Sequence, residues 1–226
     1  MIRAVVFDLW NTLVRSQAGS PFRRIQPLLR PEQAHLVDEF MWDSMRVPYP
    51  SCDAFLERWR EAMGLDPIQT RAIRQVFLEA SQDAELFPET LEALDQTRSL
   101  ARVALLSNTQ SFDMGLLEDL GLTSRLRVQV LSAAIGKLKP APEAFEAARR
   151  RLGLFPGDLV MVGDSWRDDV GGALQAGWSV IWINREGIPR PEVEPDAELV
   201  ELPDLERVPE VIRRLQEGAR CATCLG

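Results

Sequence analysis

Short apolar segments alternate with amphipathic helical patterns over most of the chain. The first five segments are almost continuously apolar and rich in β-branched residues, which is typical of strands buried on both faces of a sheet. The apolar segments cover residues 2–7, 103–106, 128–131, 159–162, 179–183 and 198–202. The helical patterns cover residues 89–100, 112–120, 142–152, 168–176 and 209–216. This alternation predicts right-handed βαβ units, and hence an α/β fold whose parallel sheet has helices on both faces.

Residues 14–86 break this alternation, and no strand is expected among them. Four helical stretches can be drawn there instead, at residues 22–29, 31–46, 52–63 and 67–83. Pro31 and Pro67 suit the first turn of a helix, and Ser51 and Asp66 suit N-cap positions. These signals predict that the whole segment is helical.

The inserted segment also carries apolar side chains at helical spacing, which predict the core of a small bundle. Trp42 and Trp59 are assigned to that core. The segment is too long to be an ordinary connection between a strand and a helix. We therefore expect two units, a core formed by residues 1–13 and 87–226 and a helical insert formed by residues 14–86.

The composition of the 226 residues, 46% hydrophobic and 27% charged, is that of a globular protein and excludes disorder as the main state. The net charge is −8 and no basic run is visible, so we expect no nucleic-acid partner and no anionic membrane surface. No apolar run is long enough to span a bilayer, and the segment before Asp8 does not resemble a signal peptide. The expected location is therefore the cytoplasm, and an anionic small-molecule substrate would need a local cationic site.

Polar residues with chemical potential follow four of the predicted strands. Asp8 ends the first strand, Ser107 ends the second, Lys139 lies after the third, and Asp164 ends the fourth with Asp169 close behind. Ligands of open α/β sheets bind beyond the carboxyl ends of the strands. At any one of these positions a helix N-cap is an equally good interpretation. All four together favour a site at one edge of the sheet.

Each of these groups has a chemical rationale. The Asp8 carboxylate can attack phosphorus or carbon and form a covalent intermediate. The Ser107 hydroxyl can hold an oxygen of the substrate, and Lys139 can neutralise the nucleophile and the transferred group. Asp164, with Asp169, offers the carboxylate oxygens that Mg²⁺ prefers. The sequence therefore predicts a nucleophile, an ammonium and a metal site together.

Lysine is almost absent from the chain. Only two of the 26 basic residues are lysines, Lys137 and Lys139, and the others are arginines. A compact ammonium and a planar guanidinium are not interchangeable in a confined site. The scarcity therefore favours a specific need for an ammonium at Lys139, whereas Lys137 is interpreted as a surface lysine.

These segments resemble the four motifs of the haloacid dehalogenase-like hydrolase superfamily over essentially the whole chain. Residues 7–13 (Phe-Asp-Leu-Trp-Asn-Thr-Leu) resemble the first motif, and residues 106–109 (Leu-Ser-Asn-Thr) the second. Lys139 and Pro140 resemble the third, and residues 163–173 the fourth, with Gly163, Asp164, Asp169, Gly172 and Ala173 in place. Four motifs in this order and spacing are highly specific.

The resemblance implies a Rossmann-like core and a helical cap that closes over the site. It also implies that Asp8 is the nucleophile of an aspartyl intermediate, which water then hydrolyses. Thr12, Ser107 and Asn108 would position the transferred group, and Lys139 would steady the charges around Asp8. The implied Mg²⁺ ligands are Asp8, the backbone carbonyl of Trp10, Asp164 and Asp169, with Asp169 also a candidate to support Lys139.

Trp10 departs from the phosphatase pattern of the superfamily. Phosphatases usually carry a second aspartate there as general acid and base, and indole cannot take that role. The 2-haloacid dehalogenases commonly have an aromatic residue at this position, but they work without metal and differ in the fourth motif. A Mg²⁺-dependent phosphohydrolase acting on a small phosphorylated metabolite is the leading hypothesis. A dehalogenase using Asp8 and a non-catalytic binding member are the alternatives.

The remaining candidates are less specific. Arg15 and Arg23 follow the first motif and could bind an anionic group of the substrate, although a solvated helix face explains them equally well. His35, the only histidine, is expected to be exposed. Cys221 and Cys224 are interpreted as part of an incidental tail rather than a redox or zinc site, since zinc needs about four ligands. The oligomeric state is not predicted.

Overall fold

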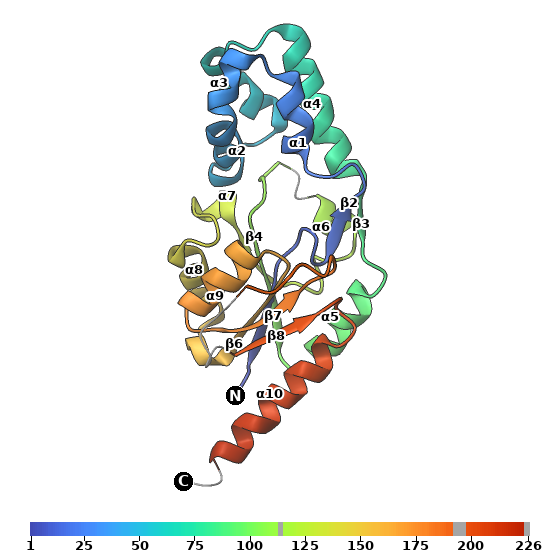
Figure 1. Ribbon diagram of the computed structural model, residues 1–226, viewed down its shortest axis with the longest axis vertical. Helices are drawn as coiled ribbons and strands as arrows, with labels where there is room; N and C mark the ends of the chain where they lie inside the picture. The colour runs from blue at the N-terminus through green and yellow to red at the C-terminus, as the bar shows by residue number, and fades with distance from the viewer. Residues whose placement is uncertain (113–114, 192–197, 224–226) are drawn as a thin grey trace.

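The computed structural model describes the backbone of residues 1–112, 115–191 and 198–223, and side chains as far as residue 218. Its centre is a six-stranded sheet in the order β5-β4-β1-β6-β7-β8, and all five pairs of neighbouring strands are parallel (Figure 1). The strands are β1 (Ala4–Phe7), β4 (Arg102–Ser107), β5 (Val128–Leu131), β6 (Leu159–Gly163), β7 (Ser179–Ile183) and β8 (Leu199–Leu202). The predicted α/β fold with a parallel sheet is confirmed.

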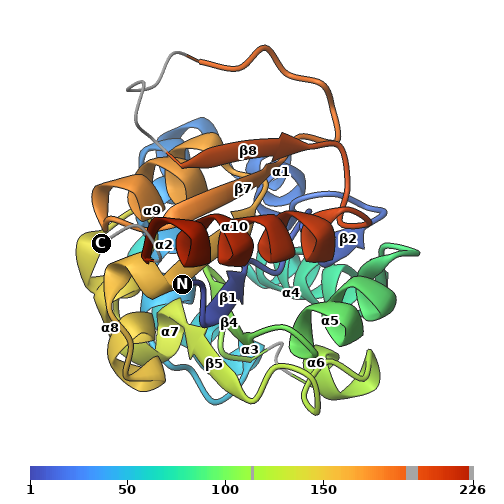
Figure 2. The same ribbon diagram turned by 90° about the horizontal axis from the view of Figure 1, so that it is seen from below.

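Two apolar layers hold this sheet, one on each face. Val5 and Phe7 of β1 point into one layer and Ala4 and Val6 into the other, and all four are fully buried. The first layer lies under α5 (Thr90–Arg98), α6 (Leu116–Asp119) and α10 (Val208–Thr223), and the second under α8 (Pro142–Leu152) and α9 (Gly172–Gln175) (Figure 2). Burial on both faces explains why the strands are continuously apolar.

The order of the strands places a crevice at the end of β1. The chain runs from β1 through β4 to the edge strand β5, and then returns to the other side of β1 with β6. Such a reversal of direction in an open parallel sheet marks the position where ligands bind. The carboxyl end of β1, which Asp8 follows, is therefore the expected centre of the site.

The helical insert forms a separate layer beyond this end of the sheet (Figure 1). Its helices are α1 (Pro21–Ile25), α2 (Val37–Arg46), α3 (Cys52–Met63) and α4 (Pro67–Gln82), with 3₁₀ turns at Gln26–Leu28 and Pro31–Leu36. Ser51 accepts a hydrogen bond from the backbone N–H of Ala54, and Asp66 accepts bonds from those of Ile68 and Gln69. Both predicted N-caps are confirmed. We call this layer the cap.

An aromatic cluster fills the cap. Phe40, Phe55 and Phe77 are fully buried, and Trp59 packs edge-on against Phe40 with ring centroids 5.5 Å apart. The prediction for Trp59 is confirmed, but that for Trp42 is wrong, because Trp42 is 42% exposed. It lies two residues from the buried Phe40 on α2, and therefore on the opposite face of the helix.

The two chain segments that join the core to the cap pair with each other. β2 (Val14–Ser16) and β3 (Ala84–Leu86) form an antiparallel ribbon, so the expectation of no strand in residues 14–86 is wrong. Arg15 stands opposite Glu85, and its Nη2 lies 2.6 Å from the Glu85 carboxylate. Strands of three residues are too short to show the alternation of apolar and polar side chains that marks a strand. Their pairing also depends on residues far apart in the chain.

Two further helices differ from the predicted bounds. The helix expected at 112–120 is only α6 (Leu116–Asp119), with residues 113–114 outside the description. Phe112 instead contacts the cap cluster, with its ring centroid 5.6 Å from that of Phe77. The helix expected at 168–176 begins earlier, as a π-helical turn at Trp166–Gly171, and continues as α9. Single π-helical turns occur often at functional sites.

No helix in the described part of the chain is both long enough and apolar enough to cross a membrane.

Candidate active site

Asp8 lies at the carboxyl end of β1, where a tight loop turns the chain back. Its backbone N–H donates to the carbonyl of Val162, 2.9 Å away, which continues the pairing with β6. The N–H groups of Leu13 and Val14 both donate to the carbonyl of Leu9, and Asn11 takes a positive φ of 59°. Asn11 tolerates this left-handed conformation better than most residues. Asp8 is only 6% exposed.

Lys139 places its ammonium between two carboxylates. Its Nζ lies 2.6 Å from Oδ1 of Asp8 and 2.5 Å from Oδ1 of Asp169, and the residue is 4% exposed. Burial by itself would lower the pKa of Lys139, but the charges of Asp169 and Asp8 outweigh it and raise that pKa. The lysine is therefore a fixed cation.

Asn108 holds the backbone of Lys139 in place. Its side-chain amide donates to the Lys139 carbonyl over 2.9 Å and accepts from the Lys139 N–H over 2.8 Å. This two-bond contact joins the end of β4 to the segment that carries the lysine. Asn108 also lines the cavity described below. It can therefore influence both the ammonium and a bound group.

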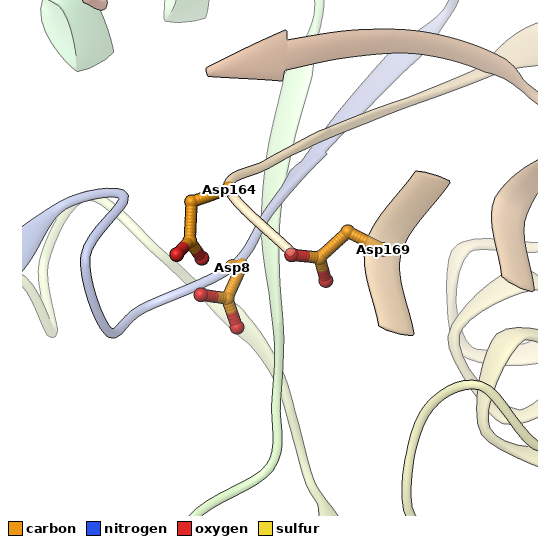
Figure 3. Close-up of side chains that lie close together, drawn as sticks. All are labelled: Asp8, Asp164 and Asp169. Carbon is orange, nitrogen blue, oxygen red and sulfur yellow. The ribbon is translucent and has the colours of Figure 1, made fainter. Parts of the chain in front are cut away.

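Three carboxylates converge at this end of the sheet (Figure 3). Asp8, Asp164 and Asp169 each offer an oxygen, and these oxygens lie within 4.8 Å of one another. Gly163 permits the approach, because a Cβ atom at this position would lie 2.3 Å from Cγ of Asp169. Both oxygens of Asp169 are already engaged, since Oδ1 contacts Lys139 and Oδ2 accepts from the N–H of Ser165.

The pKa values of two of these carboxyl groups reflect the crowding. Burial first, and then the charges of Asp8 and Asp169, raise the pKa of Asp164 to about 8. Burial also raises the pKa of Asp169 to about 7, although the neighbouring Lys139 opposes the rise. One ammonium does not balance three carboxylates, and a divalent cation would. The donor set of carboxylate oxygens suits Mg²⁺.

Two buried hydroxyls, one in the first motif and one in the second, have no hydrogen-bond partners among the described residues. Thr12 is fully buried and Ser107 is 1% exposed, and neither side-chain oxygen meets a partner among the described residues. A buried hydroxyl without a partner costs free energy. Such a cost is offset when an anion accepts the hydrogen bond, which agrees with the expected roles of Thr12 and Ser107.

Trp10 stands where the resemblance to phosphatases would require an aspartate. Its indole N–H points toward Oγ1 of Thr109, at 3.3 Å. Trp10 also lines a cavity of about 710 Å³ between the core and the cap, and Lys139 lies at the inner wall of the same cavity. The sequence position at which the resemblance to phosphatases would require a general acid and base is therefore occupied by an indole whose N–H donates to Thr109.

The predicted substrate-binding arginines lie elsewhere. Neither Arg15 nor Arg23 lines the cavity, because Arg15 pairs with Glu85 and Arg23 is exposed on α1. Arg46 of α2 and Arg167 of the π-helical turn line it instead. Arg167 follows the fourth motif and could have been suspected from that position. Nothing in the sequence separates Arg46 from the other cap arginines.

The structure also locates the minor candidates. His35 is exposed, as expected, and Lys137 is half-exposed with a contact to Glu143. The interpretation of Cys221 and Cys224 concerns side chains that lie outside the described residues.

Lys139→Arg should lower turnover by about 100-fold or more, because a planar guanidinium cannot occupy the point between two carboxylates that Nζ fills. Lys137→Arg is the matched control and should stay within about twofold of the wild type. Steady-state rates of both variants, with melting temperatures to exclude misfolding, decide the matter. Equal behaviour of the two variants would remove the special role of an ammonium at position 139.

The fold and this site combine a buried cluster of carboxylates and one ammonium, at the carboxyl end of a parallel sheet, with a helical cap. A model of the haloacid dehalogenase-like hydrolase family matches residues 2–177. The chain belongs to this family of haloacid dehalogenase-like hydrolases.

Relatives of the chain carry different activities in their names. The chain is 31% identical over 210 residues to N-acylneuraminate-9-phosphatase of Homo sapiens, a match that covers 83% of this chain and 84% of the relative. It is 27% identical to (S)-2-haloacid dehalogenase 4A of Burkholderia cepacia, with 85% and 87% covered. Its fold matches that of 2-haloacid dehalogenase from Pseudomonas syringae pv. Tomato DC3000 with a TM-score of 0.69 at 24% identity, over 95% of this chain and 99% of that one.

Proposed function

We propose that the protein is a Mg²⁺-dependent phosphohydrolase that acts on a small phosphorylated metabolite through a phosphorylated Asp8. The observation that carries the proposal is the cluster of Asp8, Asp164 and Asp169, of which only Asp8 and Asp169 pair with the ammonium of Lys139. A site with this excess of negative charge repels any anionic substrate unless a cation is added. The Homo sapiens relative, a phosphatase by name, supports the same choice.

The proposed metal ligands are Asp8, Asp164 and the backbone carbonyl of Trp10. Asp169 belongs to the same cluster but has both oxygens engaged, so its main proposed task is to orient Lys139. When bound, Mg²⁺ would neutralise charge on the transferred phosphoryl group.

The reaction divides into two displacements at phosphorus. A carboxylate oxygen of Asp8 forms a bond to phosphorus while the bond to the leaving oxygen breaks, and the leaving oxygen keeps the electron pair. Lys139 and the hydroxyls of Thr12 and Ser107 stabilise the charge on the phosphoryl oxygens. Water then attacks the same phosphorus, inorganic phosphate leaves, and the Asp8 carboxylate is restored.

A specific observation supports dehalogenation as the second candidate. Trp10 removes the general acid that an alkoxide leaving group needs, and a halide needs none. The Burkholderia cepacia relative carries this activity in its name. In this alternative, Asp8 would displace halide from the carbon that carries it, and water would hydrolyse the resulting ester.

Product analysis separates the two candidates. We expect inorganic phosphate from a panel of small phosphorylated metabolites when Mg²⁺ is present, and no chloride from 2-chloropropionate under any condition. Chloride release in the presence of excess chelator, without phosphate release from the panel, would establish the dehalogenase instead. If neither phosphate nor chloride is released from any substrate, the result would support the non-catalytic alternative.

Trp10→Asp should raise hydrolysis of alkyl phosphates, since general acid catalysis contributes about 10²–10⁴-fold where it is available. The wild type should strongly prefer substrates whose leaving group needs no proton, and it should release a burst of that group, because no base at position 10 activates the water. Rates for a series of leaving groups, measured on both proteins, test this. A flat dependence on the leaving-group pKa in the wild type would show that another residue supplies the proton.

A further inference from the structure

The cap side of the cavity combines an aromatic face with an unpaired cation. Trp42, Met41 and Met45 of α2 line it, and Trp42 is 42% exposed although it is a large apolar side chain. The guanidinium carbon of Arg46, which also lines the cavity, lies 5.2 Å from the centroid of the Trp42 ring. No carboxylate of the described residues forms an ion pair with Arg46, whereas Arg167 on the core side is paired with Asp168.

Few uncharged polar groups are available on the same side. The cap and the segment that leads into it contribute the side chains of Ser16, Ser20 and Ser81. The Ser16 hydroxyl is already bonded to Asp83. A polyhydroxylated group on this side of the cavity would find few hydrogen-bond partners, and buried hydroxyl groups without partners are costly. The wall suits a flat apolar group with one anionic substituent.

The inner end of the cavity sets a second, independent condition. Trp10 supplies no proton to the leaving oxygen, so the leaving group must depart as a stable anion. A phenolic hydroxyl has a pKa of about 10, as in tyrosine. An unactivated hydroxyl, such as that of water, has a pKa near 15.7. A phenolate therefore leaves without the help that an alkoxide requires.

We propose that the substrate is an aryl phosphate that carries a second anionic group, with its ring packed on Trp42 and that group paired with Arg46. This inference rests on the proposed phosphohydrolase activity and adds the class of its leaving group. Hydrolysis breaks the bond between phosphorus and the phenolic oxygen. The phenolate keeps the electron pair and takes its proton from solvent.

Four phosphates on one set of variants test this inference. The substrates are 3-carboxyphenyl phosphate, phenyl phosphate, glycerol 3-phosphate and acetyl phosphate, all with Mg²⁺. In the wild type, kcat/KM should be highest for 3-carboxyphenyl phosphate among the three esters, by about tenfold or more over phenyl phosphate, because a charge-assisted contact adds that much. Acetyl phosphate has no ring and reports the chemistry of the inner site alone.

The variants separate the ring contact from the charge contact. Trp42→Ala should lower kcat/KM for both aryl phosphates by about tenfold and leave acetyl phosphate within about twofold, and Trp42→Phe should restore most of the loss. Arg46→Gln should erase the advantage of the carboxylate. Arg71→Gln, an exposed cap arginine outside the cavity, is the matched control and should change nothing.

Three outcomes would overturn the inference while leaving the phosphohydrolase in place. These are a preference of the wild type for glycerol 3-phosphate, no advantage from the carboxylate, or an equal loss of acetyl phosphate hydrolysis in Trp42→Ala. Absence of hydrolysis of all four substrates, acetyl phosphate included, would overturn the proposed function itself and this inference with it.

Discussion

Asp8→Asn should reduce phosphate release by about 10⁴-fold or more, while the protein remains folded. The amide oxygen is a far weaker nucleophile than the carboxylate, and no other described carboxylate takes its place between β1 and the ammonium of Lys139. The substitution is nearly isosteric and removes one negative charge from a crowded cluster. The melting temperature without metal should therefore stay level or rise.

Single-turnover and steady-state assays on the best substrate measure this loss, and mass spectrometry of quenched wild type should detect a phosphoryl group on Asp8. Asp168→Asn provides the control, because Asp168 lies near the same edge of the sheet but pairs with Arg167. It should keep activity within a few-fold. Activity of Asp8→Asn within a few-fold of the wild type would exclude Asp8 as the nucleophile.

The parts of this molecule that were predictable from the sequence are those with a strong local signal. The strand of Val5 and Phe7 is recognisable because burial on both faces demands a continuous apolar run. Asp8 and Asp164 could be placed at one edge because parallel strands bring their carboxyl ends together. The N-cap at Asp66 follows from the hydrogen-bonding needs of one helix terminus.

The parts that escaped prediction depend on long-range geometry. The pairing of Arg15 with Glu85 joins segments some 70 residues apart, and strands of three residues show no period. The placement of Arg46 in the cavity depends on which face α2 turns toward the core. Phe112 contacts the cap cluster from the core, although its own segment looked helical. In each case, the tertiary partner decides the outcome.

The pKa of Asp164 connects metal binding to pH. Without metal, this pKa is raised to about 8 from an ordinary value near 3.9, so the folded protein binds a proton that the unfolded chain has released. The stability of the metal-free protein that comes from this group is therefore greatest below about pH 4 and is lost as the pH rises toward 8. Mg²⁺ bound by Asp164 would have to displace this proton, so its binding should become stronger as the pH rises toward 8.

Mg²⁺ should therefore raise the melting temperature more at pH 8 than at pH 6. At a concentration of 100 times Kd, ligand linkage contributes about 2.7 kcal/mol, which is roughly 5–10 °C for a chain of this size. Asp164→Asn should abolish this shift, lower Mg²⁺-dependent turnover by about 100-fold or more, and make the metal-free protein more stable at pH 8 than the wild type. Thermal melts at both pH values, with and without Mg²⁺, measure the loss of the shift and the gain in metal-free stability independently of activity. Full activity of the wild type in excess chelator, together with a melting temperature that does not respond to Mg²⁺, would contradict the metal site and favour displacement at carbon by Asp8.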